Sequence, residues 1–229
     1  MSFSPLIDGL SALIVFGGTS LATVLRAGPR ELAVTARALA GLGKPVFTAA
    51  QAKADLAAQV SAIRRDGVLR ASPRAIGDDE FDAATDAMIR SRSLDGLIER
   101  HHVFRKHRMG EANTAVRTLA QAAELGPVFG MVGTLVSLSN LPMDGLDGAA
   151  LNGAISMAVV TTLYGLLFAN LMLAPLARMV ERHAQAEEQA RQEVIDWLSA
   201  QLEPVMPRRA AAPVHPLHPH AGSRERAHA

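Results

Sequence analysis

The stretch that decides the fold is GAALNGAISMAVVTTLYGLLFANLMLAPLA, residues 148–177, which contains no acidic, basic or histidine side chain. The hydrocarbon core of a bilayer needs about 20 mostly apolar helical residues, with a range of roughly 17 to 25. Two further segments, GLSALIVFGGTSLATVL (9–25) and LGPVFGMVGTLVSLSNLPM (125–143), also lack such side chains and lie near the lower limit. We therefore predict three transmembrane helices rather than buried helices of a soluble protein.

The distribution of apolar residues, and not the overall composition, indicates the membrane. The hydrophobic fraction of 49% is ordinary for a soluble domain. The absence of cysteine excludes disulfides, thiolate metal sites and cysteine nucleophiles. A net charge of +1 gives no reason to expect nucleic acid as a partner. A cleaved signal peptide fits poorly, because no basic residue precedes the first apolar segment.

Charged residues beside the apolar segments predict the orientation. Basic residues follow the first and third segments, whereas the connection between the second and third carries only acidic ones (Arg26, Arg30, Arg37; Arg178, Arg182; Asp144, Asp147). Basic residues accumulate on the cytoplasmic side. We expect a periplasmic N-terminus, residues 27 to about 120 inside, residues 142–149 outside and a cytoplasmic C-terminus.

The remaining chain is predicted to be helical, which gives an all-α integral membrane protein with three transmembrane helices and a helical cytoplasmic domain. Short helices are expected at 30–40, 48–65 and 78–90, a long helix from 94 into the second apolar segment, and an amphipathic helix over 176–202. The predicted division is a first transmembrane helix (1–27), a cytoplasmic helical domain (28–119), two channel-like helices (120–182), an amphipathic helix (183–203) and a disordered Pro- and His-rich tail (204–229).

Two of the apolar segments carry a stripe of small and weakly polar residues at helical spacing. The members are Gly126, Gly130, Gly133, Thr134 and Ser137 in one, and Ala154, Ala158, Thr161, Thr162, Gly165 and Ala169 in the other. Such stripes are typical of close helix packing in lipid. The hydroxyls of Thr134, Thr161 and Thr162 could also line a hydrated path, although a threonine can bond to a carbonyl of its own helix.

No acidic or histidine side chain lies within the three apolar segments, and Glu124 stands at the edge of the second. A proton relay inside a membrane needs such a group. The chain could therefore supply the walls of a path, while another polypeptide would supply the proton carrier. Pro127 and Pro175 lie near the inner face, where they predict a kink and a helix boundary respectively.

GPVFGMVGTLVSL (126–138) followed by SMAVVTTLYGLLFANLMLAPLARMV (156–180) resembles the paired signature of the MotA/TolQ/ExbB proton channel family, in its flagellar stator branch. Residues 8–25, with Gly17-Gly18-Thr19, resemble the second transmembrane helix of that branch, so the resemblance covers about residues 6–182. It implies a homo-oligomeric, pentameric ring around two copies of a single-span MotB/ExbD/TolR-like partner whose aspartate carries the proton. It also implies an ion-path role for Thr134, Thr161 and Thr162, and a coupling role for Pro127 and Pro175.

The sequence departs from the flagellar branch in two ways. That branch has four spans, and the equivalent of its first transmembrane helix is missing here, which leaves the order of spans found in ExbB and TolQ. The branch also uses a basic residue, a glycine and an acid against the rotor protein; Arg64 and Gly67 fit the spacing, but Ser72 holds the acid position. Arg64 is therefore only a candidate rotor contact.

We interpret the chain as the channel-forming subunit of a proton-driven motor in a bacterial inner membrane. The alternatives are an ExbB/TolQ-like energiser of outer-membrane processes and a non-conducting membrane scaffold. Close packing is assigned to Gly17, Gly18, Gly126, Gly130, Gly133 and Gly165. No enzymatic activity, cofactor or metal is expected; for the histidines at 101–107 and in the tail, a solvated helix face and a disordered tail are favoured over metal binding.

Overall fold

The computed structural model describes residues 9–44, 47–70, 75–139 and 148–206. Within these ranges every regular element is a helix, and three helices are long and apolar enough to cross a membrane: Gly9–Gly41, Leu94–Ser139 and Gly148–Val205. The predicted fold class, all-α with three membrane-spanning helices and a helical cytoplasmic domain, is confirmed.

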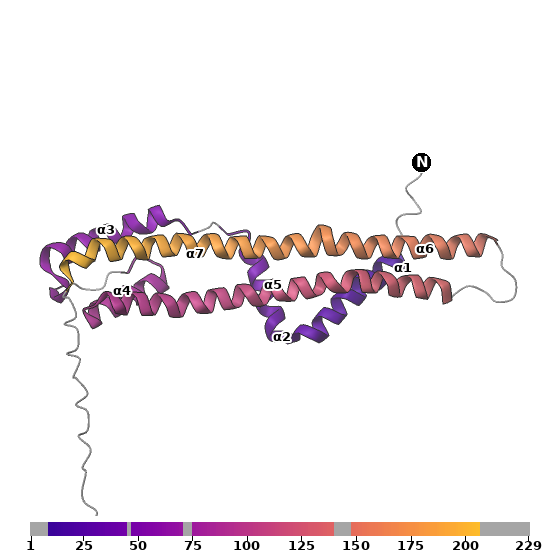
Figure 1. Cartoon of the computed structure of the whole chain (residues 1–229), viewed down its shortest axis with the longest axis horizontal. Coiled ribbons are helices and arrows are strands. Elements are labelled where there is room, and N and C mark those ends of the chain that lie inside the picture. Colours follow the sequence, from indigo (N-terminus) through magenta and orange to yellow (C-terminus); the bar gives the residue numbers. More distant parts are fainter. Residues whose placement is uncertain (1–8, 45–46, 71–74, 140–147, 207–229) are drawn as a thin grey trace, which may run out of the picture.

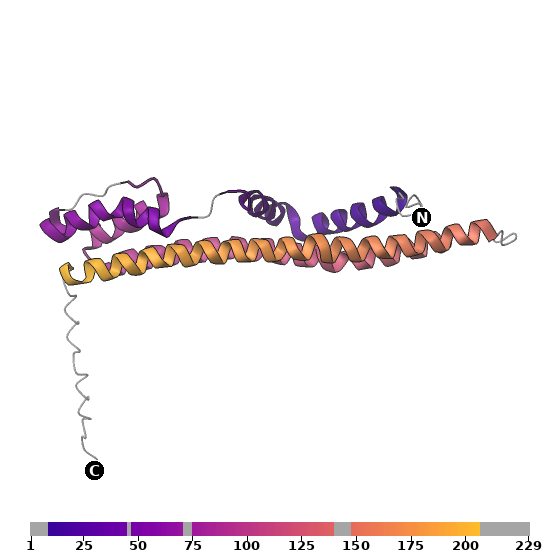
Figure 2. The same ribbon diagram turned by 90° about the horizontal axis from the view of Figure 1, so that it is seen from above.

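Two long rods form the frame of the molecule and lie side by side (Figures 1 and 2). One rod is helix α5, and the other is a continuous run of α6, the π-helical segment η4 and α7. The first span lies along one end of these rods, and α3 and α4 cover the other end (Figure 1). The bounds are α1 Gly9–Ala12, η2 Leu13–Gly17, α2 Gly18–Gly41, α3 Ala49–Asp66, η3 Val68–Arg70, α4 Asp79–Ser91, α5 Leu94–Ser139, α6 Gly148–Leu167, η4 Phe168–Leu173, α7 Ala174–Leu202 and η5 Glu203–Val205.

Helix α2 bends sharply where it leaves the first apolar segment. Gly28 has φ 72° and ψ 165°, a conformation that side chains with a Cβ rarely adopt, and Pro29 follows it. Beyond the bend, residues 29–41 run across the long axis of the rods: this part is seen lengthwise in Figure 1 and end-on in Figure 2. We call residues 29–41 the crossing helix. The sequence predicted a helix here, but not its direction.

The helices of the outer domain begin and end where local chemistry places them. Asp78 caps α4, since its Oδ1 accepts hydrogen bonds from the backbone N–H groups of Glu80 and Phe81, each 3.1 Å long. Gly67, with φ 78°, ends α3. Both helices lie within one residue of the predicted ranges, and α5 begins at Leu94 as expected.

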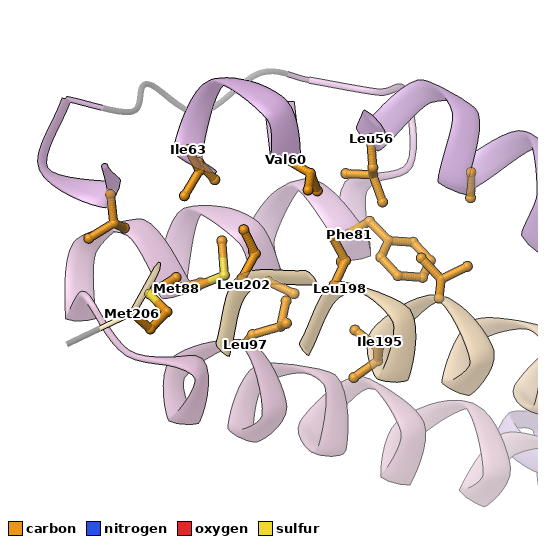
Figure 3. Packing of buried hydrophobic residues seen from close by; sticks show 14 residues of the cluster. Leu56, Val60, Ile63, Phe81, Met88, Leu97, Ile195, Leu198, Leu202 and Met206 are labelled. Carbon is orange, nitrogen blue, oxygen red and sulfur yellow. The ribbon is translucent and has the colours of Figure 1, made fainter. Parts of the chain in front are cut away.

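The main hydrophobic core lies at the end of the rods that α3 and α4 cover (Figure 3). Its largest fully buried side chains come from α3, α4, α5 and α7: Leu56, Ile63, Met88, Leu97, Leu198 and Leu202. Burying a side chain of this size contributes roughly 1.5–3 kcal/mol. This core therefore holds four separate helices together outside the apolar segments.

Two expectations about the end of the chain need correction. Pro175 does not end a helix, because α6, η4 and α7 form one uninterrupted run. The tail was predicted to be disordered from residue 204, but residues 203–205 form η5 and Met206 is buried in the main core. The core extends this far because Met206 also donates its backbone N–H to the Leu202 carbonyl.

The predicted division of the chain stays a prediction. Helices α5 and α7 run without a break across the proposed boundaries at 119/120 and 182/183, whereas the boundary at 27/28 falls at the bend of α2. Residues 207–229 of the proposed tail, together with Ser72, Asp144 and Asp147, lie outside the described residues.

Candidate functional site

The two stripes of small residues face each other and form a seam between α5 and α6. A methyl group built on Gly165 would lie 2.5 Å from the carbonyl oxygen of Gly126, and one on Gly126 would lie 2.8 Å from that of Gly165. Farther along α5, a methyl group on Gly133 would lie 2.6 Å from the Thr161 side chain. The backbones approach this closely only because these positions lack a Cβ. In lipid, such close packing is a principal source of helix association.

A hydrogen bond crosses the seam near the far end of α5. The Ser137 hydroxyl lies 3.0 Å from the Ala154 carbonyl of α6 and 3.1 Å from the Thr134 carbonyl of its own helix. The seam thus combines van der Waals contact with one polar contact between helices. The sequence indicated small-residue packing, but did not reveal that each stripe is the other's partner within one chain.

The three candidate ion-path threonines occupy different environments. Thr161 is fully buried in the seam, whereas Thr134 and Thr162 are half-buried. Each hydroxyl donates to carbonyls of its own helix: Thr134 to Met131 (2.6 Å), Thr162 to Ala158 (3.1 Å), and Thr161 to Met157 or Ala158 (3.0 Å each). A hydroxyl used as a donor keeps its oxygen lone pairs, so it can still accept from water or contact a cation. Thr134 and Thr162 are placed to do so at an accessible surface of this chain.

The two prolines lie inside long helices. Pro127 lies within α5 and adjoins Gly126 of the seam. Pro175 lies in the first turn of α7, directly after η4, which has the wider π-helical hydrogen bonding. A proline removes one backbone donor, and π-helical turns inside α-helices are frequent at functional sites. The structure therefore places each proline at an irregular or tightly packed part of a span.

The first span contacts the pair through Gly18 and aromatic rings. A Cβ on Gly18 would lie 2.3 Å from the ring of Phe129 in α5, whereas one on Gly17 would meet only Leu13 of its own helix, at 3.5 Å. The Phe16 ring packs on Phe168 edge-on, with centroids 4.7 Å apart. Of the two glycines assigned to packing, Gly18 is the one against which another helix packs.

Comparison with known proteins fits this geometry. The sequence profile of the MotA/TolQ/ExbB proton channel family matches residues 81–193. This range includes all of α5, α6 and η4, nearly all of α4 and most of α7. These residues form a domain of this family. Motility protein A of Cereibacter sphaeroides is 27% identical over 135 residues, which are 59% of this chain and 53% of that protein. Chemotaxis protein PomA of Vibrio alginolyticus is 26% identical over 206 residues, 87% of this chain and 79% of that protein.

The fold is also that of a solved relative. A chain in the flagellar MotAB stator complex from Bacillus subtilis superposes with a TM-score of 0.75 and 22% identity, over 88% of this chain and 81% of that one. The alignment to the Cereibacter protein spans about half of that protein's length, 53%. The family domain, the similar motility proteins and three apolar helices identify the chain as a multi-pass protein of the bacterial inner membrane.

Outside the spans, the family domain contains a buried polar network that joins α4, α5 and α7. Arg108 of α5 pairs with Glu80 of α4 and, at 2.6 Å, with Glu188 of α7. Arg191 of α7 pairs with Asp78 at 3.0 Å and lies 4.5 Å above the Phe47 ring. Burial lowers the pKa of Arg191, but hydrogen bonds and the charges of Asp78 and Glu187 outweigh it and raise the pKa overall. The network fastens α4 to both rods.

The sequence interpretation missed this network. It placed His101 on a solvated helix face, which is wrong, because His101 is only 5% exposed. Arg108 of the same helix is also largely covered. His101, Arg105 and Arg108 recur at helical spacing, and that periodicity was the available signal. Among the described residues, no group of three or more His, Asp and Glu is arranged to hold a metal.

His101 gives the outer domain a predicted pH dependence. Burial lowers the pKa of His101 by more than the Gln192 hydrogen bond and the Glu188 charge raise it. The nearby charges of His102 and Arg105 lower this pKa further. Glu80 and Arg191 line the small cavity beside the His101 ring. The unfolded chain therefore binds the His101 proton more tightly than the folded chain. Stability should be complete above about pH 6.5 and decline as the pH falls toward the lowered pKa. Thermal unfolding at pH 5.5–7.5 should show this slope, and His101→Gln should flatten it; an unchanged slope would assign it to the carboxylates.

Arg64, the candidate rotor contact, is exposed near the end of α3. Its guanidinium donates to Gln201 of α7 over 2.9 Å. It thus lies at the end of the molecule away from the spans, together with α3 and the main core (Figure 1).

Proposed function

We propose that this chain is the channel-forming subunit of a proton-driven, stator-like membrane motor. In this proposal it lines an ion path together with a single-span MotB/ExbD/TolR-like partner and couples ion flow to mechanical work. The observation that carries the proposal is the α5–α6 pair: it places half-buried Thr134 and Thr162 on apolar segments that contain no acidic residue of their own. An aspartate on the partner would then carry the proton.

The proposed assembly is a pentameric ring around the partner. Many large apolar side chains of the spans are exposed in the single chain, including Leu135, Val159, Leu163 and Leu171. These surfaces are available for lipid, neighbouring subunits and the partner. A role for Thr161 in the ion path would require the seam to open, since its side chain has no accessible surface here. In the same proposal, Pro127 and Pro175 transmit the effect of ion flow, and Arg64 is a candidate contact to a rotor protein.

The test is proton flux, with Thr162→Val as the informative variant. The chain expressed without its partner should not acidify the cytoplasm, and co-expression should permit flux once any plug is removed. Thr162→Val removes a hydroxyl and should lower flux roughly tenfold, the loss expected for one hydrogen bond. Leu163→Val, which trims an exposed apolar side chain of the same helix, should have little effect. A cytoplasmic pH reporter at matched expression measures both; strong flux from the chain alone would refute the partner-carboxylate argument.

The proposed orientation has the N-terminus in the periplasm and the C-terminus in the cytoplasm. Because the chain has no cysteine, single cysteines report cleanly. A cysteine replacing exposed Ala149 at the start of α6 should react with an impermeant maleimide added to intact spheroplasts, and one replacing Arg70 should not. The opposite pattern would reverse the orientation.

A second candidate function is an ExbB/TolQ-like energiser of outer-membrane processes. It is favoured by Ser72, which stands at the position where the rotor-binding pattern has an acid. A co-purifying partner with a peptidoglycan-binding domain would favour the stator. A co-purifying partner that also binds an outer-membrane transporter would favour the energiser. Absence of proton flux with either partner would favour the third alternative, a non-conducting membrane scaffold.

A further inference from the structure

Arginines mark the membrane surface on all three spans at one level of the molecule. Arg26 directly follows the first apolar segment. On the rods, Ala115 and Leu119 of α5 pack with Ala177 and Val180 of α7, so Arg117 and Arg178 lie level with each other. The first span reaches the same level, because Thr23 and Val24 share a cavity with Leu119 and Leu173. The membrane surface nearest the outer domain, outside the hydrocarbon core, therefore lies at these arginines.

The crossing helix begins three residues past Arg26 and lies along this boundary. Its apolar side faces the bilayer end of the rods: Leu32 lines the cavity with Leu119 and Phe168, and Leu39 packs against the cluster that contains Ala115. Its polar side, with Arg30 and Arg37, faces the outer domain. The headgroup region is about 5–7 Å thick on each side of the hydrocarbon core. A helix in this position lies among lipid headgroups.

A basic cavity of about 650 Å³ separates the polar side of the crossing helix from α5. Its charged lining residues are Arg30, Glu31, Arg37, Lys106, His107 and Glu111. Both carboxylates are already paired, Glu111 with Arg37 at 3.5 Å and Glu31 with Arg117 at 3.0 Å. Within the described part of the chain, Arg30 and Lys106 make no ion pair. The cavity therefore carries unbalanced positive charge from two different helices.

Exposed apolar side chains of the first span end just before the crossing helix that carries Arg30. Leu21, Val24 and Leu25 of the first span are 62%, 49% and 77% exposed, and they immediately precede Arg26 and the bend. An acyl chain lying on these residues would place its headgroup beside Arg26 and Arg30. A soluble phosphate would make no use of this apolar surface, which favours a lipid as the source of the anion.

We propose that the cavity between the crossing helix and α5 binds the phosphate headgroup of an anionic phospholipid, with Arg30 and Lys106 as its principal contacts. Such a lipid would connect the first span to α5 at the membrane surface. Basic pockets of this kind beside transmembrane helices suit anionic headgroups, and each Lys or Arg near the surface strengthens the attraction. The proposal does not depend on ion conduction.

The experiment counts lipids bound to the purified full-length chain by native mass spectrometry, in neutral detergent titrated with phosphatidylglycerol or phosphatidylcholine. The wild-type chain should retain phosphatidylglycerol preferentially. Arg30→Gln with Lys106→Gln should weaken its apparent affinity about 30-fold, with phosphatidylcholine binding unchanged. Arg30→Lys with Lys106→Arg keeps both charges and should stay within about threefold of wild type. Circular dichroism and size-exclusion profiles verify that each variant is folded.

The control removes equal charge far from the cavity: Arg65→Gln with Arg70→Gln, at the exposed end of α3 and in η3. This variant should bind phosphatidylglycerol like wild type. An equal loss in the control would reduce the effect to net charge and overturn the proposal. So would unchanged binding in the Arg30/Lys106 variant, or equal retention of both lipids. Complete displacement of phosphatidylglycerol by millimolar inorganic phosphate would assign the cavity to a soluble anion instead.

Discussion

Gly165→Val should disrupt the α5–α6 seam and leave little correctly folded protein in the membrane. Its Cβ would lie 2.5 Å from the Gly126 carbonyl oxygen and 3.2 Å from the Gly130 Cα, and both obstacles are backbone. A backbone cannot change rotamer to make room, so the two spans must separate along much of the seam. Overpacking typically costs 1–3 kcal/mol. We expect a loss above about 3 kcal/mol, because valine adds two further methyl groups at the same point.

The matched control is Gly153→Val on the same helix. A Cβ at Gly153 meets nothing within 4 Å, so the change carries the same intrinsic cost of a β-branched residue in a helix without the collision. The comparison uses thermal aggregation of the detergent-solubilised chains, followed by size-exclusion chromatography. Equal behaviour of the two variants would mean that α5 and α6 do not pack through Gly126 and Gly165. Gly130→Leu should resemble Gly165→Val, because its Cβ would lie 3.1 Å from the Thr161 carbonyl oxygen.

Local sequence signals were sufficient for the helices. Uncharged runs located the three spans, and helix start and stop signals placed α3, α4 and the beginning of α5 to within one residue. These features depend on a few neighbouring residues and on hydrophobic periodicity. The bend at Gly28 was also present in the sequence, as Gly28-Pro29 before Arg30, although its effect on direction requires the positive φ that only the structure provides.

Contacts between distant segments could not be obtained in this way. A stripe of small residues predicts close packing but does not identify its partner, so the pairing of Gly126 with Gly165 was not predicted. The same holds for Thr161, which shares a helical face with Thr162 yet is the one buried in the seam. Periodicity gives the face of a helix, whereas the occupant of that face depends on tertiary packing.

The polar network that fastens α4 to α5 and α7 leads to the second large expected effect: Glu188→Ala should cost about 3 kcal/mol. Glu188 is 7% exposed, with Arg108 2.6 Å from Oε2, and His101 3.4 Å and Arg105 3.6 Å from Oε1. Removing one partner of a buried pair leaves the other charge uncompensated, which typically costs 3–5 kcal/mol. The lower end applies, because Arg108 keeps Glu80 as a partner.

Thermal unfolding measures this loss, and limited proteolysis locates it, since release of α4 should expose residues 75–93 to cleavage. Glu181→Ala is the control: Glu181 is exposed on the same helix and only accepts a hydrogen bond from Gln185, so its removal should cost less than about 1 kcal/mol. The double variant Glu188→Met with Arg108→Met replaces both partners and should recover part of the stability. Neither of these two positions then holds an unpaired buried charge. Glu80, which loses Arg108, still has Arg191 at 3.5 Å. A double variant no more stable than Glu188→Ala would show that the network's contribution lies in Arg108 and Glu80 rather than in the Arg108–Glu188 pair.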